Sequence, residues 1–117
     1  MTTEKSIVDA IRRYLKSIGA KTYKMHGGPH GHAGAPDILG CYTRCDGKAV
    51  MLCLEVKKPG EDPTPIQRHE LAAWEKAGAK TGCVSSVQAV KDLLLEKALD
   101  KYEHHLSDHE RGYPLKD

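Results

Sequence analysis

The sequence predicts a single α/β domain in which helices flank a mixed central sheet, in the order αβββαβα. Three observations support this fold class. The 117 residues suit one compact core. Segments with three- to four-residue apolar spacing are interleaved with short apolar runs typical of strands. Turn-forming residues separate these segments. We expect the domain to span residues 1–101 and a polar C-terminal tail to follow at 102–117.

The spacing of apolar residues predicts three helices. The first runs from about Glu4 to Ser17, with Thr3 as its N-cap. The second opens at Thr64-Pro65-Ile66-Gln67, which combines a capping threonine, a proline at the first helical position and the glutamine of a capping box, and it runs to about Ala77. The third is expected from Val87 to Leu99.

Four short segments predict strands. Lys21-Thr22-Tyr23-Lys24-Met25 alternates in polarity, and two apolar runs follow at residues 37–42 and 49–57. The Asp46-Gly47 pair between these two runs is a strong hairpin signal, so we expect them to pair antiparallel. Residues 81–84 give the fourth strand.

Charge is distributed unevenly along the chain. The formal net charge is +2, but residues 1–60 carry ten Lys or Arg against five Asp or Glu, whereas the remainder is acidic. A positive surplus of this kind attracts a phosphate backbone, although solvated surface lysines explain it almost as well.

The composition is that of a soluble globular protein, with 39% hydrophobic and 29% charged residues. No apolar stretch approaches the roughly 20 residues of a membrane span, and the first residues lack the pattern of a secretory signal. We therefore expect no membrane partner and a cytoplasmic location, which is the host cytoplasm if the chain is phage-encoded. The four cysteines are expected to be buried free thiols.

The end of the third strand carries the first candidate site. In Glu55-Val56-Lys57 the two charged side chains emerge on one face, because strand side chains alternate. An isolated pair of this kind is usually a strand end exposed to water. Here, however, the predicted hairpin brings Asp37 beside Glu55. Two neighbouring carboxylates repel at neutral pH, and a divalent cation that bridges them removes this cost.

Together these residues resemble the two-part motif of the PD-(D/E)xK nuclease superfamily, whose fold is a restriction-endonuclease-like core. The closer resemblance is to the virus-type replication and repair nuclease (VRR-NUC) family, in its stand-alone phage or bacterial form. Gly34-Ala35-Pro36-Asp37 and Glu55-Val56-Lys57 match its motif, and Thr64-Pro65-Ile66-Gln67 matches the helix that follows. Glu4 matches an acidic residue on the first helix. The resemblance covers residues 4 to about 95.

The resemblance implies a catalytic centre. Asp37, Glu55 and the main-chain carbonyl of Val56 are expected to bind Mg²⁺ or Mn²⁺, and Lys57 to orient the attacking water or stabilise the phosphate. The implied activity is that of a Mg²⁺-dependent, structure-selective DNA endonuclease. Its expected substrate is branched DNA, above all a four-way (Holliday) junction.

Four further residues have two interpretations each. Glu4 is expected to assist catalysis, but a glutamate in the first turn also suits the helix dipole. Gln67 is expected at the active site, although the capping box gives it a structural role. Lys58 and Arg68 are candidate nucleic-acid contacts, and solvated side chains are the simpler interpretation.

The loop with His26, His30 and His32 is expected to close over nucleic acid, because its glycine spacing gives a transition metal no fixed geometry. Leu94, Leu95 and Leu99 spread around the third helix, so we expect one side to pack on the core and another on a second copy in a homodimer. Three alternatives remain: a less selective DNA nuclease, a nucleic-acid-binding module without useful catalysis, and a zinc-binding regulator.

Overall fold

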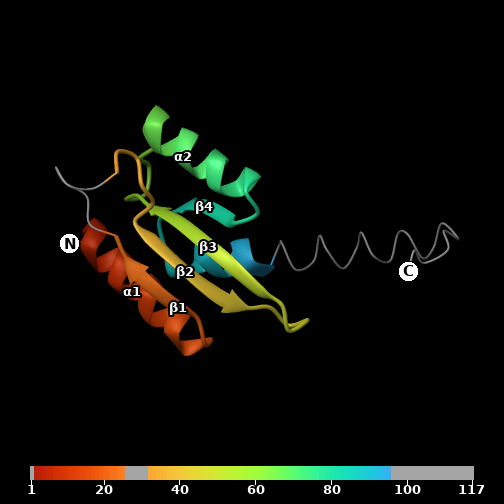
Figure 1. Cartoon of the computed structure of the whole chain (residues 1–117). Coiled ribbons are helices and arrows are strands. Elements are labelled where there is room, and N and C mark those ends of the chain that lie inside the picture. Colours follow the sequence, from red (N-terminus) through yellow and green to blue (C-terminus); the bar gives the residue numbers. More distant parts are fainter. Residues whose placement is uncertain (1, 26–31, 96–117) are drawn as a thin grey trace, which may run out of the picture.

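The fold is a four-stranded sheet with helices on both sides (Figure 1). The computed structural model describes residues 2–25 and 32–95. The elements in chain order are α1 (Glu4–Ser17), β1 (Lys21–Lys24), β2 (Ile38–Thr43), β3 (Ala49–Val56), α2 (Pro65–Lys76) and β4 (Lys80–Val84). Residues 87–95 are helical, and this helix reaches the end of the described part of the chain. The predicted order αβββαβα is confirmed.

The sheet is mixed, as the sequence predicts. Its strand order is β1-β2-β3-β4, in which β1 and β2, and β2 and β3, are antiparallel, while β3 and β4 are parallel. The hairpin between β2 and β3 closes with a positive φ of 85° at Gly47. Helix α2 makes the crossover that parallel neighbours require.

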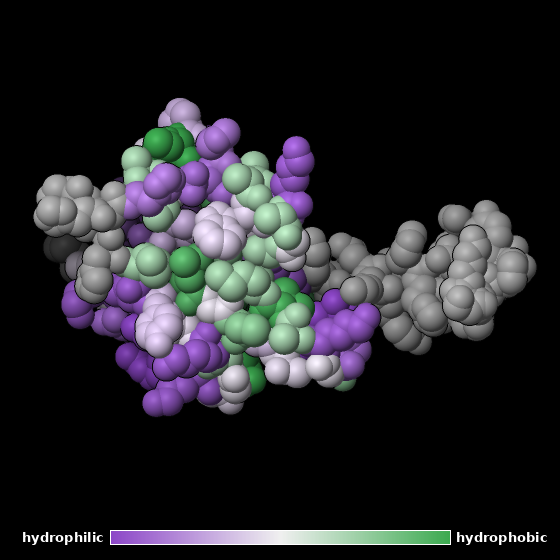
Figure 2. Space-filling view, in the orientation of Figure 1, coloured by the Kyte–Doolittle hydropathy of each residue, from purple (hydrophilic) through white to green (hydrophobic). Residues whose placement is uncertain are grey.

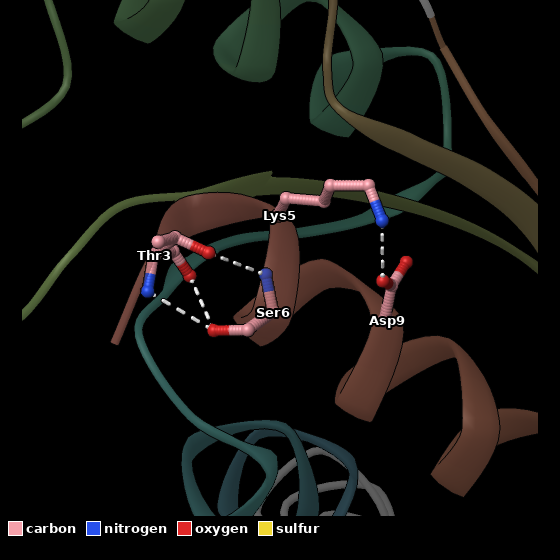
Figure 3. Close-up of polar contacts among 4 residues, drawn as sticks. All are labelled: Thr3, Lys5, Ser6 and Asp9. Carbon is pink, nitrogen blue, oxygen red and sulfur yellow. Dashed lines mark hydrogen bonds and ion pairs between the residues drawn. The ribbon is translucent and has the colours of Figure 1, made fainter. Parts of the chain in front are cut away.

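The start of α1 is held by a reciprocal cap (Figure 3). The Thr3 hydroxyl accepts a hydrogen bond from the Ser6 amide at 3.0 Å, and the Ser6 hydroxyl accepts one from the Thr3 amide at 3.0 Å. Lys5, in the first turn, forms an ion pair at 3.1 Å with Asp9, which lies one turn further along the helix. The predicted N-cap at Thr3 is therefore confirmed, and it fixes where Glu4 begins the helix.

The main core lies between α1 and the sheet. Ile11, Leu15, Leu54 and Val56 are each 0% exposed. The helical segment 87–95 adds to the same core through Val90, which is also fully buried. Because Leu54 and Val56 point into this core, the residues that alternate with them on β3 point to the opposite face of the sheet.

Helix α2 lies along β3 and β4 and has no buried residue of its own. The loop before β2 packs against its first turn. Gly34 has a φ of +79°, and a Cβ atom added there would lie 2.8 Å from the main-chain oxygen of Ile66. Only glycine suits this position, which holds the segment leading to Asp37 next to the start of α2.

One expectation from the sequence is wrong, and another concerns residues outside the described part of the chain. The burial expected for all four cysteines is wrong: Cys53 is buried, but Cys41, Cys45 and Cys83 are exposed, because they lie on the face opposite the main core or in the hairpin turn. The C-terminal part of the third helix, including Leu99, and the tail at 102–117 lie outside the described residues. Within the described part, no helix has the length and apolar character needed to cross a membrane.

Candidate active site

The hairpin brings Asp37 and Glu55 together. Ile38 pairs with Leu54 in the antiparallel register of β2 and β3, so the residues one step further on each strand are neighbours on the opposite face. The Val56 amide donates a hydrogen bond to Asp37 Oδ2 at 2.7 Å, which fixes this carboxylate across the two strands. The sequence prediction that these two acids meet is confirmed.

Glu55 is a buried acid in an unfavourable environment. Its side chain is 2% exposed, and its Oε1 atom has no hydrogen-bond partner among the described residues. Burial, the hydrogen bond with Asp37 and the negative charge of Asp37 raise the pKa of Glu55 to about 8, against a smaller lowering by Lys57. Without a cation, the pair therefore retains a proton near neutral pH.

This environment fits a small divalent cation. An unpartnered buried carboxylate oxygen beside a second carboxylate is a hard-oxygen donor set of the kind that Mg²⁺ and Mn²⁺ prefer. In residues 2–25 and 32–95 no three His, Cys, Asp or Glu side chains gather as a metal-binding group. Mg²⁺ nevertheless fits, because it commonly uses one or two carboxylates and keeps several waters.

Two more of the predicted site residues, Val56 and Lys57, lie next to the pair. The Lys57 amide donates to the Val84 carbonyl at 3.1 Å, which continues the strand geometry beyond β3 and keeps Lys57 on the same side as Glu55. The Val56 side chain is buried in the core, so only its main chain faces the site. The charge of Glu4 is the smallest of the contributions that raise the pKa of Glu55, and no contact between Glu4 and the pair is observed among the described residues.

The other predicted site residues make structural contacts. Gln67 Oε1 accepts a hydrogen bond from the Thr64 amide at 2.8 Å, which confirms the capping box, while the active-site role of Gln67 stays a prediction. Lys58 is exposed, with its amide 3.4 Å from Glu61 Oε1. Arg68 is also exposed, and its Nε donates to the Pro63 carbonyl at 3.2 Å.

One neighbour of the site was not anticipated. Cys83 pairs with Glu55 in the parallel register of β3 and β4. Burial and the charge of Glu55 raise the pKa of its thiol. The sequence predicts a strand at residues 81–84 but does not give its register in a parallel pair.

Of the three histidines in the predicted loop, His32 is described. Its Nε2 atom lies 3.4 Å from Glu70 Oε2. His26 and His30 lie outside the described residues.

The raised pKa of Glu55 predicts how the stability of the protein depends on pH. In metal-free protein the folded state binds this proton more tightly than the unfolded state, whose pKa is near 4.5. The free energy of unfolding should therefore fall as the pH rises from about 4.5 to about 8. Urea unfolding with a chelator present measures this trend.

The matched variant is Glu55→Gln, which keeps the shape and removes the titration. Its stability should change less with pH over this window than that of the wild type. Identical pH profiles for the two proteins would show that Glu55 ionises normally.

Comparison with known proteins shows a similarity to a solved structure. No model of a protein family matches the chain, and no curated protein is significantly similar to it. A solved structure described as "VRR_NUC domain" matches with a TM-score of 0.64 and 27% sequence identity, over 80% of this chain and 96% of that one. The hairpin, the crossover helix and the carboxylate pair thus occur in a chain that has the fold of a VRR_NUC domain.

Proposed function

We propose that this protein is a metal-dependent nuclease that hydrolyses phosphodiester bonds in DNA. The observation that carries the proposal is the pairing of Asp37 with the buried Glu55, whose Oε1 atom has no hydrogen-bond partner among the described residues, beside Lys57. The similarity to a VRR_NUC domain supports it, because this domain type is named for nuclease activity.

The proposed centre assigns a role to each residue. Asp37, Glu55 and the Val56 carbonyl hold Mg²⁺ or Mn²⁺. When bound, such a cation lowers the pKa of an attacking water and neutralises charge on the phosphate. Lys57 orients that water or stabilises the charge that grows on the phosphate. Glu4 helps to position the water, and the expected products carry a 5′-phosphate and a 3′-hydroxyl.

The hydrogen bond from the Val56 amide contributes to this mechanism before any substrate arrives. It fixes one oxygen of Asp37, and therefore limits the orientations of the carboxylate. A ligand held in this way loses less conformational freedom when the cation binds. Lys58 and Arg68, both exposed, are proposed to contact the DNA backbone.

We further propose that the substrate is branched DNA, with a four-way (Holliday) junction preferred, and that the enzyme is a homodimer acting in the cytoplasm. Resolving a junction requires two symmetric incisions, and two-fold symmetry supplies two sites from one chain. The helical segment 87–95 supports a dimer, because Leu94 packs on the core while Leu95 is 59% exposed.

The first functional prediction concerns the three central residues. Asp37→Asn, Glu55→Gln and Lys57→Gln should each reduce Mg²⁺-dependent cleavage by more than about 100-fold, because each removes a metal ligand or a preorganised charge. Cleavage is measured on branched DNA, and DNA binding should largely persist. Lys48→Gln, in the exposed hairpin turn, is the control. Normal turnover by Asp37→Asn would refute the proposed centre.

The second prediction separates the two roles of Gln67. Gln67→Ala and Thr64→Ala each break the observed capping box, at a typical cost of about 1 kcal/mol. Only Gln67→Ala removes the side chain proposed for the site, so it should lose more cleavage activity than Thr64→Ala at equal loss of melting temperature. Equal activities would leave Gln67 with the capping role alone.

The third prediction tests the dimer. Wild type should have the mass of a dimer by light scattering and cut both strands of a plasmid cruciform in one binding event. Leu95→Lys should shift the mass towards the monomer and convert paired cuts into single nicks. Ile18→Lys changes another exposed apolar residue, 43% exposed, and should do neither. A wild-type monomer that nicks linear duplex as readily as a junction would contradict the dimer and the substrate preference, but not the nuclease activity.

A further inference from the structure

A basic hollow lies between α1 and the edge strand β1, away from the carboxylate pair. Its volume is about 390 Å³. Four of the residues that line it are basic, namely Arg12, Arg13, Lys16 and Lys21, and Asp9 is its single acid. In Figure 2, hydrophilic side chains gather over α1 and β1, whereas hydrophobic ones gather over the sheet between β1 and α2. We call the four basic residues the α1–β1 basic cluster.

Two hydrogen bonds to Thr22 fix the orientation of the Arg12 side chain within this cluster. Its Nε donates to the Thr22 hydroxyl at 3.2 Å, and one terminal nitrogen donates to the Thr22 carbonyl at 3.1 Å. Thr22 itself is buried, at 8% exposure. These contacts use two of the five N–H donors of a guanidinium, so the orientation is set while donors remain for a ligand.

The cluster keeps an excess of positive charge, because four basic side chains face one carboxylate in the hollow. Asp9 forms its ion pair with Lys5, outside the cluster. Among the residues that the structure describes, no ion pair links any of the four cluster residues to a carboxylate. The Lys21 ammonium instead lies 4.9 Å from the centre of the Tyr23 ring. The hollow therefore attracts anions.

The position of the cluster relative to the carboxylate pair follows from the strand register. Thr22 pairs with Gly40, and Asp37 lies three residues before Gly40 along the chain. At about 3.3 Å per strand residue this is an offset of about 10 Å along the strands, while the Thr22 side chain faces α1 and the carboxylate pair lies on the opposite face of the sheet. Along α1, Arg12 and Lys16 lie eight and twelve residues beyond Glu4, or about 12 to 18 Å.

From the fixed orientation of Arg12 and the excess of basic residues in the hollow we infer that the α1–β1 basic cluster binds the phosphodiester backbone of the DNA substrate, away from the scissile phosphate. The inference rests on the proposed nuclease function. Arg13 and Lys16 are one helical turn apart and both exposed, which suits successive phosphates of a chain better than one small anion.

The test is the salt dependence of DNA binding. Affinity for a branched DNA is measured between about 50 and 200 mM salt, with Ca²⁺ in place of Mg²⁺ to prevent cleavage. Each lost phosphate contact should reduce the slope of log K against log salt by about 0.9, so the double variant Arg13→Gln/Lys16→Gln should reduce it by about 1.8. Lys16→Gln alone should reduce it by about half that amount.

Lys76→Gln is the matched control. Lys76 is the basic residue in the last turn of α2, as Lys16 is in α1, so both variants lose the same charge at the same helical position. Lys76→Gln should leave the slope unchanged. An equal reduction of the slope in Lys16→Gln and Lys76→Gln would overturn the inference, because the slope would then depend on net charge alone.

A second measurement locates the contact on the DNA. Neutral methylphosphonate linkages are placed in turn at each position that flanks the mapped cut, and at one or more of these positions they should weaken binding by wild type but not by the double variant. Equal weakening of both proteins, or a double variant with wild-type slope, would overturn the inference. Either result is compatible with normal cleavage, whereas absence of cleavage in a wild type that binds DNA would refute the nuclease proposal alone.

Discussion

The antiparallel pairing of β2 with β3 is the constraint on which the candidate site depends. The pairing of Ile38 with Leu54 sets the register, and the hydrogen bond from the Val56 amide to Asp37 holds the acid at the end of that ladder. A slip of one residue would turn Glu55 into the main core and Leu54 out of it. The apolar side chains that alternate with Glu55 therefore protect the register, because a slip would bury a charge among aliphatic residues.

The same arrangement lowers the stability of the folded protein, because it buries one acid next to another. A buried carboxyl group with an oxygen that lacks a hydrogen-bond partner among the described residues is unfavourable, and the charge of a second carboxylate beside it increases the cost. The neighbouring hydrophobic core compensates, since Leu54 and Val56 on the same strand are fully buried. Strand β3 thus packs into the core through one face and carries the candidate site on the other.

Much of the fold could be predicted from the sequence because its signals are local. The cap at Thr3, the capping box at Thr64 and the turn at Gly47 are each written in a few adjacent residues, and each is observed. The meeting of Asp37 and Glu55 was also predictable, because a short hairpin limits the register of its strands.

The rest could not be predicted because it depends on contacts between distant segments. The place of Cys83 beside Glu55 follows from the parallel register of β4, which the crossover through α2 leaves open in the sequence. The α1–β1 basic cluster combines residues of a helix and of the next strand, whose side chains meet only in the folded chain. Exposure of Cys41 likewise depends on which face of the sheet a helix covers.

Helix α2 has a consequence for the dynamics of the protein. It has no buried residue, in contrast to α1, which has four. Elements with few buried contacts open at a small fraction of the free energy of global unfolding. Amide protons of α2 should therefore exchange with solvent through local opening, while those of β3 exchange only when the whole domain unfolds. Because Gly34 packs on Ile66, such opening would also release the segment that leads to Asp37.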